Sequence, residues 1–460
     1  MSEVVSVFGL GKLGCTMLAC FAHKGWHVIG MDINEGFVNK VNRGISPIYE
    51  PGVDELIKVN SDRISATTDP GYAVINSSIS FVIVPTPSTN DGDFSTKYVE
   101  AVVAGIGSAL RKKNEYHLVV ITSTVLPSDM ETIVKLLEKT SGKKCCVDFS
   151  VCYNPDFIAL GSVVRDFLNP DMILIGESDN KGGSILESIH RKLVDNNPNI
   201  HRMKLYNAEL AKISLNAYCT LKITFANILA EICENMPYGD VDVITNAIGD
   251  DARIGRKYFK GGLSYGGPCF PRDNRAFVYT ATKFGVKNLL AGKTDEINDY
   301  QRGNRIPTKI IEILRERNTD EIAILGLTYK NDTTLIEESA AISIIRSLST
   351  EGVNITVYDP AGMDEAKREF KSMPNVKCAI SVKECIEGKN VCFIATPWNE
   401  FKELTPEDFL NAMKEPTIFD AWNLYNFSKK DGIDYRQIGK WFSYESKEQL
   451  PHSTKDSVTV

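Results

Sequence analysis

The sequence predicts an α/β protein in which two doubly wound parallel-sheet domains are joined by a long central helix. Three stretches carry this prediction. Val4 to Phe8 is a short apolar run that leads directly into a glycine-rich turn and a helical pattern. Asn207 to Asn235 contains neither proline nor glycine and predicts one long helix. Glu321 to Asp359 alternates again between apolar strands and a helical segment, which is typical of a second parallel sheet.

Length, composition and charge limit the possible classes of protein. A chain of 460 residues, 43% hydrophobic and 24% charged, is expected to form two to four globular domains. The net charge of −7 and the absence of a long basic run make nucleic acid an unexpected partner. Eleven scattered cysteines and six histidines form no metal-ligand motif, so we expect no metal site. Without a signal peptide or an apolar run of about 18 residues, we expect a cytoplasmic protein with no membrane partner.

The first glycine-rich turn is Gly9-Leu10-Gly11-Lys12-Leu13-Gly14, and Asp32 follows the next predicted strand, His27 to Met31. A GxGxxG turn between a strand and a helix, with an acidic residue about 20 positions later, is the fingerprint of a Rossmann-like dinucleotide-binding domain. A carboxylate at position 32 would accept hydrogen bonds from ribose hydroxyls and repel a 2′-phosphate, which favours NAD over NADP. The expected cofactor residues in this part are Gly9, Gly11, Leu13, Gly14 and Asp32. The alternative is a glycine-rich turn that binds no ligand.

Polar residues follow several of the later strands. Thr86, Thr124, Asn154 and Asp156 come after apolar runs that we expect to end near residues 84, 122 and 152. Loops after the carboxyl ends of parallel strands line the ligand crevice, so these side chains are expected near the nicotinamide. Ordinary turn chemistry explains each of them equally well.

The predicted central helix carries Lys212 and Asn216 four residues apart, and therefore on one face. A lysine and an asparagine that project together from an apolar helix could stabilise a developing oxyanion. A solvated lysine beside a surface asparagine is the alternative. Pro237 and Gly239 end this helix.

A further glycine-rich loop runs from Gly261 to Asp273 and contains Gly266-Gly267-Pro268-Cys269-Phe270-Pro271-Arg272-Asp273. If a helix starts here, Cys269 lies at its N-terminus, where the helix dipole favours a thiolate, and Asp273 shares its face. The chemistry this pattern indicates is covalent catalysis by Cys269 with Asp273 as acid or base. The alternative is a buried structural cysteine, the more common role of a free cysteine.

The C-terminal third repeats the strand–helix pattern without a GxGxxG turn, so we expect it to bind a different nucleotide or none. We predict domains at residues 1–200, 201–305 and 306–445, followed by a flexible tail at 446–460, which is polar and charged.

Seven ordered motifs make nearly the whole chain resemble the nucleotide-sugar 6-dehydrogenase family, most closely its UDP-glucose branch. The matching stretches are the Gly9 to Gly14 turn, Pro47-Ile48-Tyr49-Glu50-Pro51-Gly52, Val84-Pro85-Thr86-Pro87, Ser123-Thr124-Val125, Asn154-Pro155-Asp156-Phe157, Ala208-Glu209-Leu210-Ala211-Lys212 and the segment Gly266 to Asp273. The resemblance implies oxidation of a sugar C6 alcohol to an acid by two successive hydride transfers to NAD.

The resemblance also implies roles for the residues found above. Cys269 would attack the aldehyde intermediate to form a thiohemiacetal and then a thioester, which water hydrolyses. Lys212 and Asn216 would stabilise the oxyanion at C6. Asp273 would hold or deprotonate a water that Thr124 helps to position. Asp156 would act as an acid or base.

The nucleotide sugar is implied to bind in the C-terminal half. Tyr258 and Lys260 match the family's loop around the base and diphosphate, while Tyr329 and Lys330 match an aromatic–lysine pair near the sugar. Gly266 belongs to the same expected substrate site. Arg253 resembles an arginine that is shared across a homodimer, so the helical middle region is also the expected dimerisation region, and residues 306–445 the UDP-sugar-binding domain.

The chain departs from the family pattern at several positions. Asp156 stands where a glutamate is usual, Leu160 replaces a second glutamate, and Ile336 and Trp422 replace arginines. These changes leave the substrate open among UDP-glucose, a UDP-N-acetylhexosamine and GDP-mannose. Two other readings remain: a simple two-electron hydroxyacid dehydrogenase that does not need Cys269, and a catalytically weakened nucleotide-sugar-binding protein.

Overall fold

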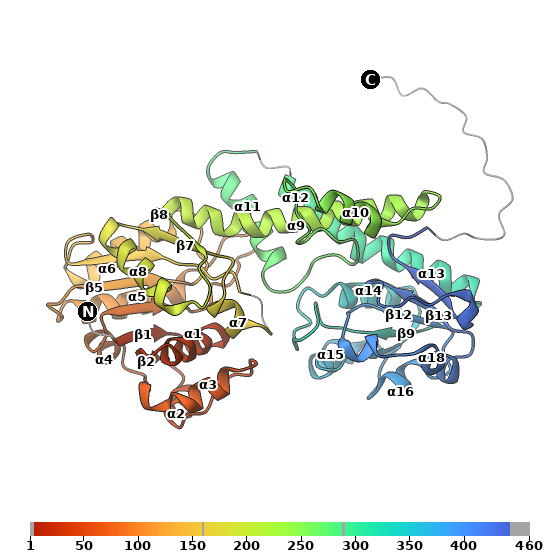
Figure 1. The fold of residues 1–460 in the computed structure, drawn as a ribbon, viewed down its shortest axis with the longest axis horizontal. Helices are drawn as coiled ribbons and strands as arrows, with labels where there is room; N and C mark the ends of the chain where they lie inside the picture. The colour runs from red at the N-terminus through yellow and green to blue at the C-terminus, as the bar shows by residue number, and fades with distance from the viewer. Residues whose placement is uncertain (1–3, 159–160, 288–289, 442–460) are drawn as a thin grey trace, which may run out of the picture. The chain divides into compact units, whose positions relative to one another are not determined.

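The computed structural model describes residues 4–158, 161–287 and 290–441 (Figure 1). The chain divides into two compact units. The first contains Met1–Cys219 and Pro268–Asp295, and the second contains Thr220–Gly267 and Glu296–Val460. The predicted domain boundaries after residues 200 and 305 stay predictions, and the predicted tail at 446–460 lies outside the described residues.

The first unit is built on an eight-stranded sheet in the order β3-β2-β1-β4-β5-β6-β7-β8. Its pairs are parallel except for β6 with β7. Every residue of β4, β5 and β6 is buried, as expected for parallel strands covered on both faces. The strands are β1 (Val4–Phe8), β2 (His27–Met31), β3 (Ile64–Thr67), β4 (Ile79–Val82), β5 (His117–Ile121), β6 (Phe149–Tyr153), β7 (Met172–Glu177) and β8 (Asn199–Lys204).

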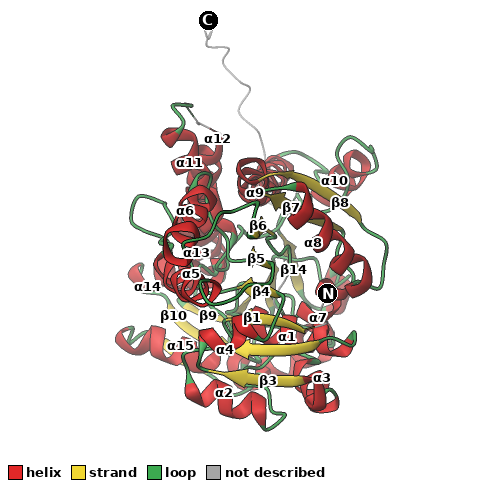
Figure 2. Cartoon of the chain, turned by 90° about the vertical axis from the view of Figure 1, so that its left-hand side faces the viewer, coloured by secondary structure: helices red, strands yellow, loops and turns green. Residues whose placement is uncertain are grey.

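Helices cover both faces of this sheet, with α5 and α6 on one side and α1 and α8 on the other (Figure 2). Each side has its own apolar core, one packed around Phe21 of α1 and the other around Val103 of α5. The helices of this unit are α1 (Lys12–His23), α2 (Glu35–Asn42), α3 (Val53–Val59), α4 (Pro70–Ile75), α5 (Lys97–Leu110), α6 (Asp129–Ser141), α7 (Val163–Leu168), α8 (Asn180–Leu193), the first half of α9 (Leu205–Asn235) and α11 (Phe270–Lys283), with a 3-10 turn at Ser61–Arg63.

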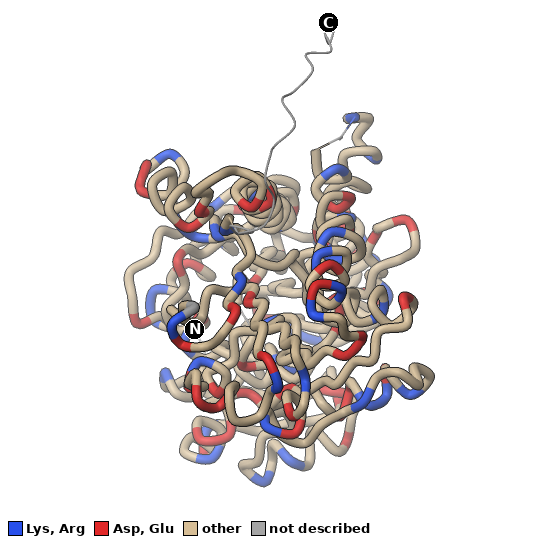
Figure 3. The backbone as a smooth tube through the Cα atoms, turned by 90° about the vertical axis from the view of Figure 1, so that its right-hand side faces the viewer, with Lys and Arg blue, Asp and Glu red and all other residues tan. Residues whose placement is uncertain are grey.

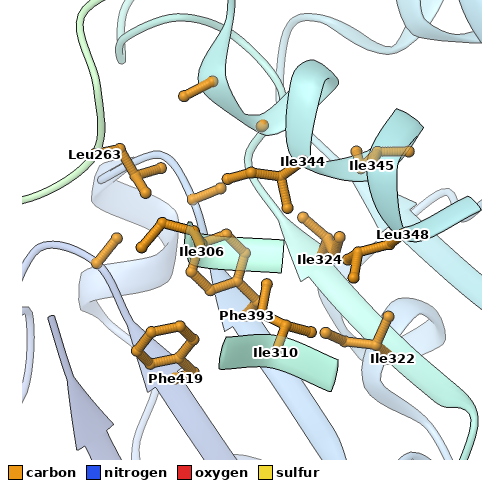
Figure 4. Close-up of a cluster of buried hydrophobic side chains, with 14 of the residues drawn as sticks. Leu263, Ile306, Ile310, Ile322, Ile324, Ile344, Ile345, Leu348, Phe393 and Phe419 are labelled. Atoms are coloured by element: carbon orange, nitrogen blue, oxygen red, sulfur yellow. The ribbon is translucent and has the colours of Figure 1, made fainter. Parts of the chain in front are cut away.

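The second unit contains a six-stranded sheet in the order β11-β10-β9-β12-β13-β14, in which every pair is parallel. The strands are β9 (Glu321–Leu325), β10 (Asn354–Tyr358), β11 (Val376–Cys378), β12 (Val391–Ile394), β13 (Thr417–Asp420) and β14 (Asp434–Gln437). Figure 4 shows the core on one face, where Ile310 and Ile344 lie against Phe393.

The helices of the second unit flank this sheet or precede it. They are α10 (Val241–Gly249), α13 (Ile306–Glu316), α14 (Ala340–Thr350), α15 (Met363–Glu369), α16 (Val382–Ile386), α17 (Asn399–Lys402) and α18 (Pro406–Ala412), while α12 (Leu290–Tyr300) crosses from the first unit into the second. This unit also has two 3-10 turns, Phe370–Ser372 and Lys429–Asp431.

The predicted fold class is confirmed, with local differences. The central helix spans 31 residues and starts two residues earlier than predicted. Residues 290–316 are helical throughout, because a π-helical turn at Gln301–Arg305 links α12 to α13. Pro307 is tolerated because it lies in the first turn of α13. The apolar run expected to end near residue 152 forms β6, which starts only at Phe149. Cys146 has φ 66°, and its N–H closes a turn onto the Phe149 carbonyl oxygen.

Lys and Arg residues are interspersed with Asp and Glu residues along the described chain (Figure 3). No helix among residues 4–158, 161–287 and 290–441 combines the length and apolarity that a membrane crossing needs.

Candidate active site

The glycine-rich turn between β1 and α1 has the backbone geometry of a phosphate site. Gly9 has φ 100°, and a Cβ there would come within 2.3 Å of the Ile83 carbonyl oxygen. A Cβ on Gly14 would meet the Gly9 carbonyl oxygen at 1.8 Å, whereas one on Gly11 would have open space. No side chain caps the start of α1. The N–H groups of its first turn therefore suit an anion, and the turn fits a dinucleotide pyrophosphate.

Asp32 lies beside this turn at the end of β2. Its Oδ2 accepts a hydrogen bond from the Leu10 N–H at 2.7 Å, and its Oδ1 accepts one from Asn34 N–H at 2.8 Å. The carboxylate is thus fixed next to the glycine turn, as a ribose-binding residue requires. Leu13 is half-buried in the first turn of α1.

The candidate catalytic side chains of α9 and α11 lie together within the first unit. Asn216 Nδ2 donates to Asp273 Oδ2 at 2.6 Å, and both side chains are buried. Lys212, one turn earlier on α9, is also buried and donates through Nζ to the Asp156 carbonyl oxygen. Its Nζ lies 4.5 Å from the centre of the Phe157 ring. The predicted Lys212/Asn216 face therefore exists and points inward.

Cys269 is the N-cap residue of α11 and is exposed, whereas Asp273 in the first turn is fully buried. The Asp273 N–H donates to the Cys269 carbonyl oxygen at 2.8 Å, which is the first hydrogen bond of the helix. The helix start expected for the cysteine loop is thus observed. Cys269 is therefore not a buried structural cysteine.

Burial lowers the pKa of the Lys212 ammonium, while the negative charges of Asp273, Cys269 and Asp156 oppose that effect. A buried amine with a lowered pKa exchanges protons more readily near neutral pH than a solvated lysine. Arg272 and Lys212 both interact electrostatically with the Cys269 sulfur.

Arg272 was not singled out from the sequence, although it stands next to Asp273 in the cysteine motif. Its Nε and Nη2 donate to Asp273 Oδ1 at 2.9 and 2.8 Å, and its guanidinium lies 4.7 Å from the Phe94 ring centre. Asp273 is therefore held from two sides, by Arg272 and Asn216. The sequence showed only that an arginine is adjacent to a proposed catalytic carboxylate. The structure shows that the Arg272 side chain folds back to contact the Asp273 carboxylate.

Asp156 follows β6 and lies close to Lys212. Burial raises the pKa of its carboxyl to about 7, and the Lys212 charge lowers it. Its Oδ2 atom is inaccessible to solvent and has no hydrogen-bond partner among the described residues. An acid with a pKa near neutrality, beside a buried lysine, suits general acid–base work.

Thr86 and Thr124 come together after β4 and β5. The Thr86 hydroxyl donates to the Thr124 carbonyl oxygen at 2.8 Å, and Thr124 itself is half-buried. Asn154 instead belongs to the interior, where its Oδ1 contacts His190 Nε2 at 2.8 Å and its Nδ2 donates to the Leu174 carbonyl oxygen. Asn154 is thus a buried structural residue, held by hydrogen bonds within the core of the first unit.

The candidate substrate residues belong to the second unit. Tyr258 is half exposed and has φ 61°. Lys260 Nζ donates to the Trp422 carbonyl oxygen at 3.2 Å. Arg253 has a side chain that is 86% exposed and pairs with Asp251 of its own chain at 2.6 Å. This arginine is available at the surface, and sharing it with a second subunit remains a prediction.

Two glycines allow close packing beneath the cysteine loop. A Cβ on Gly266 would come within 2.2 Å of the Glu338 carbonyl oxygen. Gly267 has φ 79°, and a Cβ there would lie 2.5 Å from the Tyr329 ring. Lys330 Nζ lies 5.9 Å from the centre of the same ring. The Tyr329 ring therefore packs directly against Gly267 within the second unit.

The structure shows what two of the four departures from the family pattern, Ile336 and Trp422, contact. Ile336 packs against the core of the second unit. Trp422 donates through Nε1 to the Ala395 carbonyl oxygen at 2.9 Å and lies against Gly262, where a Cβ would be 3.3 Å from its ring. Leu160 lies outside the described residues. Among the described residues, no group of three or more His, Cys, Asp or Glu side chains could hold a metal ion.

Three parts of the chain match one protein family. Residues 3–194 match the NAD binding domain, residues 206–300 the central domain and residues 323–427 the UDP binding domain of the UDP-glucose/GDP-mannose dehydrogenase family. A glycine-rich unit for NAD followed by a domain for a second nucleotide defines an NAD-dependent oxidoreductase of nucleotide sugars. The chain belongs to the UDP-glucose/GDP-mannose dehydrogenase family, and its general activity is NAD-dependent nucleotide-sugar 6-dehydrogenation.

Individual relatives cover most of the chain. The UDP-glucose 6-dehydrogenase AglM of Haloferax volcanii is 33% identical over 441 residues, which are 94% of this chain and 99% of the relative. A GDP-mannose 6-dehydrogenase of Pseudomonas aeruginosa is 34% identical over 77% of this chain and 80% of its own. The structure of a UDP-glucose dehydrogenase from Pyrobaculum islandicum superposes with a TM-score of 0.82 at 29% identity, covering 95% of this chain and 98% of that one. The expected family and cofactor are confirmed.

Proposed function

We propose that the enzyme oxidises UDP-glucose to UDP-glucuronate in two steps, through a thioester on Cys269. The observation that carries the covalent part is the cluster of Lys212, Asn216 and Asp273 beside the surface-accessible Cys269. The choice of UDP-glucose is supported by the Haloferax volcanii relative, which matches 94% of this chain. A simple two-electron hydroxyacid dehydrogenase does not need a nucleophilic cysteine, so that alternative gives Cys269 no chemical role.

The first step is the loss of hydride from C6 and of a proton from its hydroxyl. NAD, when bound at the Gly9–Gly14 turn, accepts one hydride in each oxidation. Lys212, whose pKa is lowered by burial, holds the C6 oxygen and can accept its proton. The second N–H of the Asn216 amide donates to the same oxygen as negative charge develops there.

The second step proceeds on the protein. The Cys269 thiolate adds to the aldehyde carbon, forming a C–S bond and the alkoxide of a thiohemiacetal. Hydride loss from that carbon re-forms the C=O bond and leaves a thioester. Water then adds to the acyl carbon, the C–S bond breaks, and the acid and the thiol are released. Asp273 and Thr124 orient this water, and Asp156, with a pKa of about 7, removes its proton.

A panel of sugar nucleotides tests this proposal. UDP-glucose, a UDP-N-acetylhexosamine and GDP-mannose are incubated with NAD, and NADH and acid are both measured. We expect two NADH per acid with UDP-glucose as the preferred substrate. Preference for another sugar would reassign the substrate while retaining the chemistry, and no turnover on any of them would favour a weakened nucleotide-sugar-binding protein.

The Cys269→Ser variant tests the covalent step. It should stop or stall after the first hydride, whereas Cys146→Ser, which replaces another exposed cysteine, should behave like the parent enzyme. Acid formation at the normal rate by Cys269→Ser would refute the thioester route.

We further propose that the enzyme forms a homodimer through α9 and α10 and that Arg253 serves the partner's substrate site. Large apolar side chains are exposed on these helices, among them Phe225, Ile232 and Val243. Phe225 and Ile232 are seven residues apart and lie on one stripe of α9. Sedimentation of Phe225→Lys should show a monomer where the parent chain is a dimer. A cytoplasmic location is proposed because the cysteines are free thiols.

A further inference from the structure

Glu209 of α9 is a buried carboxylate that the steps above do not use. Its side chain is completely inaccessible to solvent. Oε1 accepts a hydrogen bond from the Met130 N–H at 2.8 Å, and Oε2 accepts one from the Ser128 N–H at 3.4 Å. Both donors belong to the start of α6, so a residue of α9 caps a different helix. The capped helix directly follows the loop that carries Thr124.

The turn that Glu209 caps has an unfavourable backbone conformation. Ser128 is the N-cap residue of α6, has φ 92°, and provides no capping hydrogen bond from its own side chain. A serine rarely adopts this left-handed conformation without support from its surroundings. The Glu209 carboxylate provides that support, because it accepts the N–H of Ser128 itself and that of Met130 two residues later.

Lys283, in the last turn of α11, holds the same segment from another side. Its Nζ donates to Ser128 Oγ at 2.7 Å and to the Pro127 carbonyl oxygen at 3.3 Å. Asp129 closes the turn, because its Oδ2 accepts the Leu126 N–H at 2.8 Å. Residues 126–130 are therefore fixed by charged groups from α6, α9 and α11.

The three helices that meet here include both catalytic helices. Glu209 precedes Lys212 by three residues on α9, and Lys283 belongs to the helix that begins at Cys269 and contains Asp273. Thr124 is fixed on its other side by the Thr86 hydroxyl. Glu209 thus links the backbone position of the Thr124 loop to the helix that carries Lys212.

We infer that Glu209 is a positioning residue for the final hydrolysis, holding the Thr124 loop at the distance from α9 that the attacking water needs, with Lys283 as a second anchor. The inference rests on the thioester route proposed above. Displacement of a water-orienting group by about 1 Å slows a reaction on the order of 100-fold. Neither oxidation depends on that water, so loosening the loop should slow hydrolysis selectively.

The test uses the full-length Glu209→Gln enzyme with UDP-glucose and NAD. We expect a rapid burst of two NADH per subunit, followed by steady turnover roughly 10- to 100-fold slower than in the parent enzyme. Intact-protein mass spectrometry should show the acyl group on Cys269 during that phase. The KM values for both substrates should change less than about twofold. Glutamine keeps the size of the side chain, but its amide nitrogen cannot accept the second of the two backbone N–H groups that the Glu209 carboxylate binds.

Two further variants make the outcome decisive. Glu131→Gln removes an exposed carboxylate from the same first turn of α6, where it contacts Lys135 and Tyr206, and should behave like the parent enzyme. Lys283→Met removes the second anchor at an exposed position and should show the same burst with a smaller loss. The inference about Glu209 would be overturned if neither Glu209→Gln nor Lys283→Met accumulated an acyl adduct while the parent enzyme yielded two NADH per acid. The proposed function would still stand in that case. A parent enzyme that yields one NADH, or none, would instead overturn the proposed function.

Discussion

Replacement of Asp156 by asparagine should make the protein more stable at alkaline pH while impairing catalysis. Burial raises the pKa of this carboxyl from 3.8 to about 7 in the folded protein. Between these values the unfolded chain has released the proton and the folded protein still holds it. Stability therefore falls as pH rises from about 4 to about 7, and the loss is complete above pH 7. Asparagine has no carboxyl group that titrates, so the Asp156→Asn variant does not undergo this loss of stability.

The size of the effect follows from the pKa. A folded-state pKa about three pH units above the unfolded value corresponds to about 4 kcal/mol, at about 1.4 kcal/mol per unit. Roughly 3 kcal/mol of this falls between pH 5 and pH 8. For a folding unit of about 250 residues, each kcal/mol moves Tm by about 2 to 4 °C. The Asp156→Asn variant should therefore gain about 6 to 12 °C over the parent enzyme between about pH 5 and pH 8.

Differential scanning fluorimetry of both proteins at pH 5, 6, 7 and 8 measures this difference. Asp62→Asn, which removes a carboxylate that is 76% exposed, should show a constant Tm difference from the parent enzyme. The reasoning is refuted if the Tm difference between Asp156→Asn and the parent enzyme does not grow with pH. The kcat of the parent enzyme should also fall below about pH 7, as the base becomes protonated, and the variant should lack this acid limb.

Three further substitutions test the geometry of the site. Gly9→Ala places a Cβ 2.3 Å from the Ile83 carbonyl at φ 100°, and calorimetry should show NAD binding weakened at least about 10-fold. Lys212→Met should lower kcat about 100- to 10,000-fold with little change in the Kd for NAD, since the amine acts on the C6 oxygen. Gly267→Ala drives a Cβ into the Tyr329 ring and should lower Tm and raise the KM for the nucleotide sugar.

Each of these substitutions has a matched control. Gly11→Ala has open space around its new Cβ and should melt like the parent enzyme, and Lys135→Met on α6 removes an exposed lysine without loss of turnover. Gly352 has the same φ of 79° as Gly267 but nothing within 4 Å, so Gly352→Ala isolates the backbone cost from the clash with Tyr329. Equal effects of the two glycine substitutions would show that the Tyr329 contact contributes nothing.

The local pattern was enough to predict both parallel sheets. Apolar runs such as those of β4 and β5 are buried on both faces, and the glycines at 9 and 14 occur where side chains cannot fit. These are properties of short segments, set by backbone geometry and by the burial of consecutive residues. The helical connection at Gln301–Arg305 was not predicted, because its buried Arg305 is held by ion pairs with Glu234 and Glu231 of the distant α9.

The sequence by itself determined the order of the motifs, the glycine turn, the long helix and the pairing of Lys212 with Asn216 on one helical face, because these depend on spacing along the chain. Only the tertiary structure decided that Arg272 turns back onto Asp273, that Asp156 has a pKa near 7 beside Lys212, and that Glu209 caps a helix 79 residues away. Hydrogen bonds and desolvation depend on which segments meet in space, and a one-dimensional pattern carries no record of those distances.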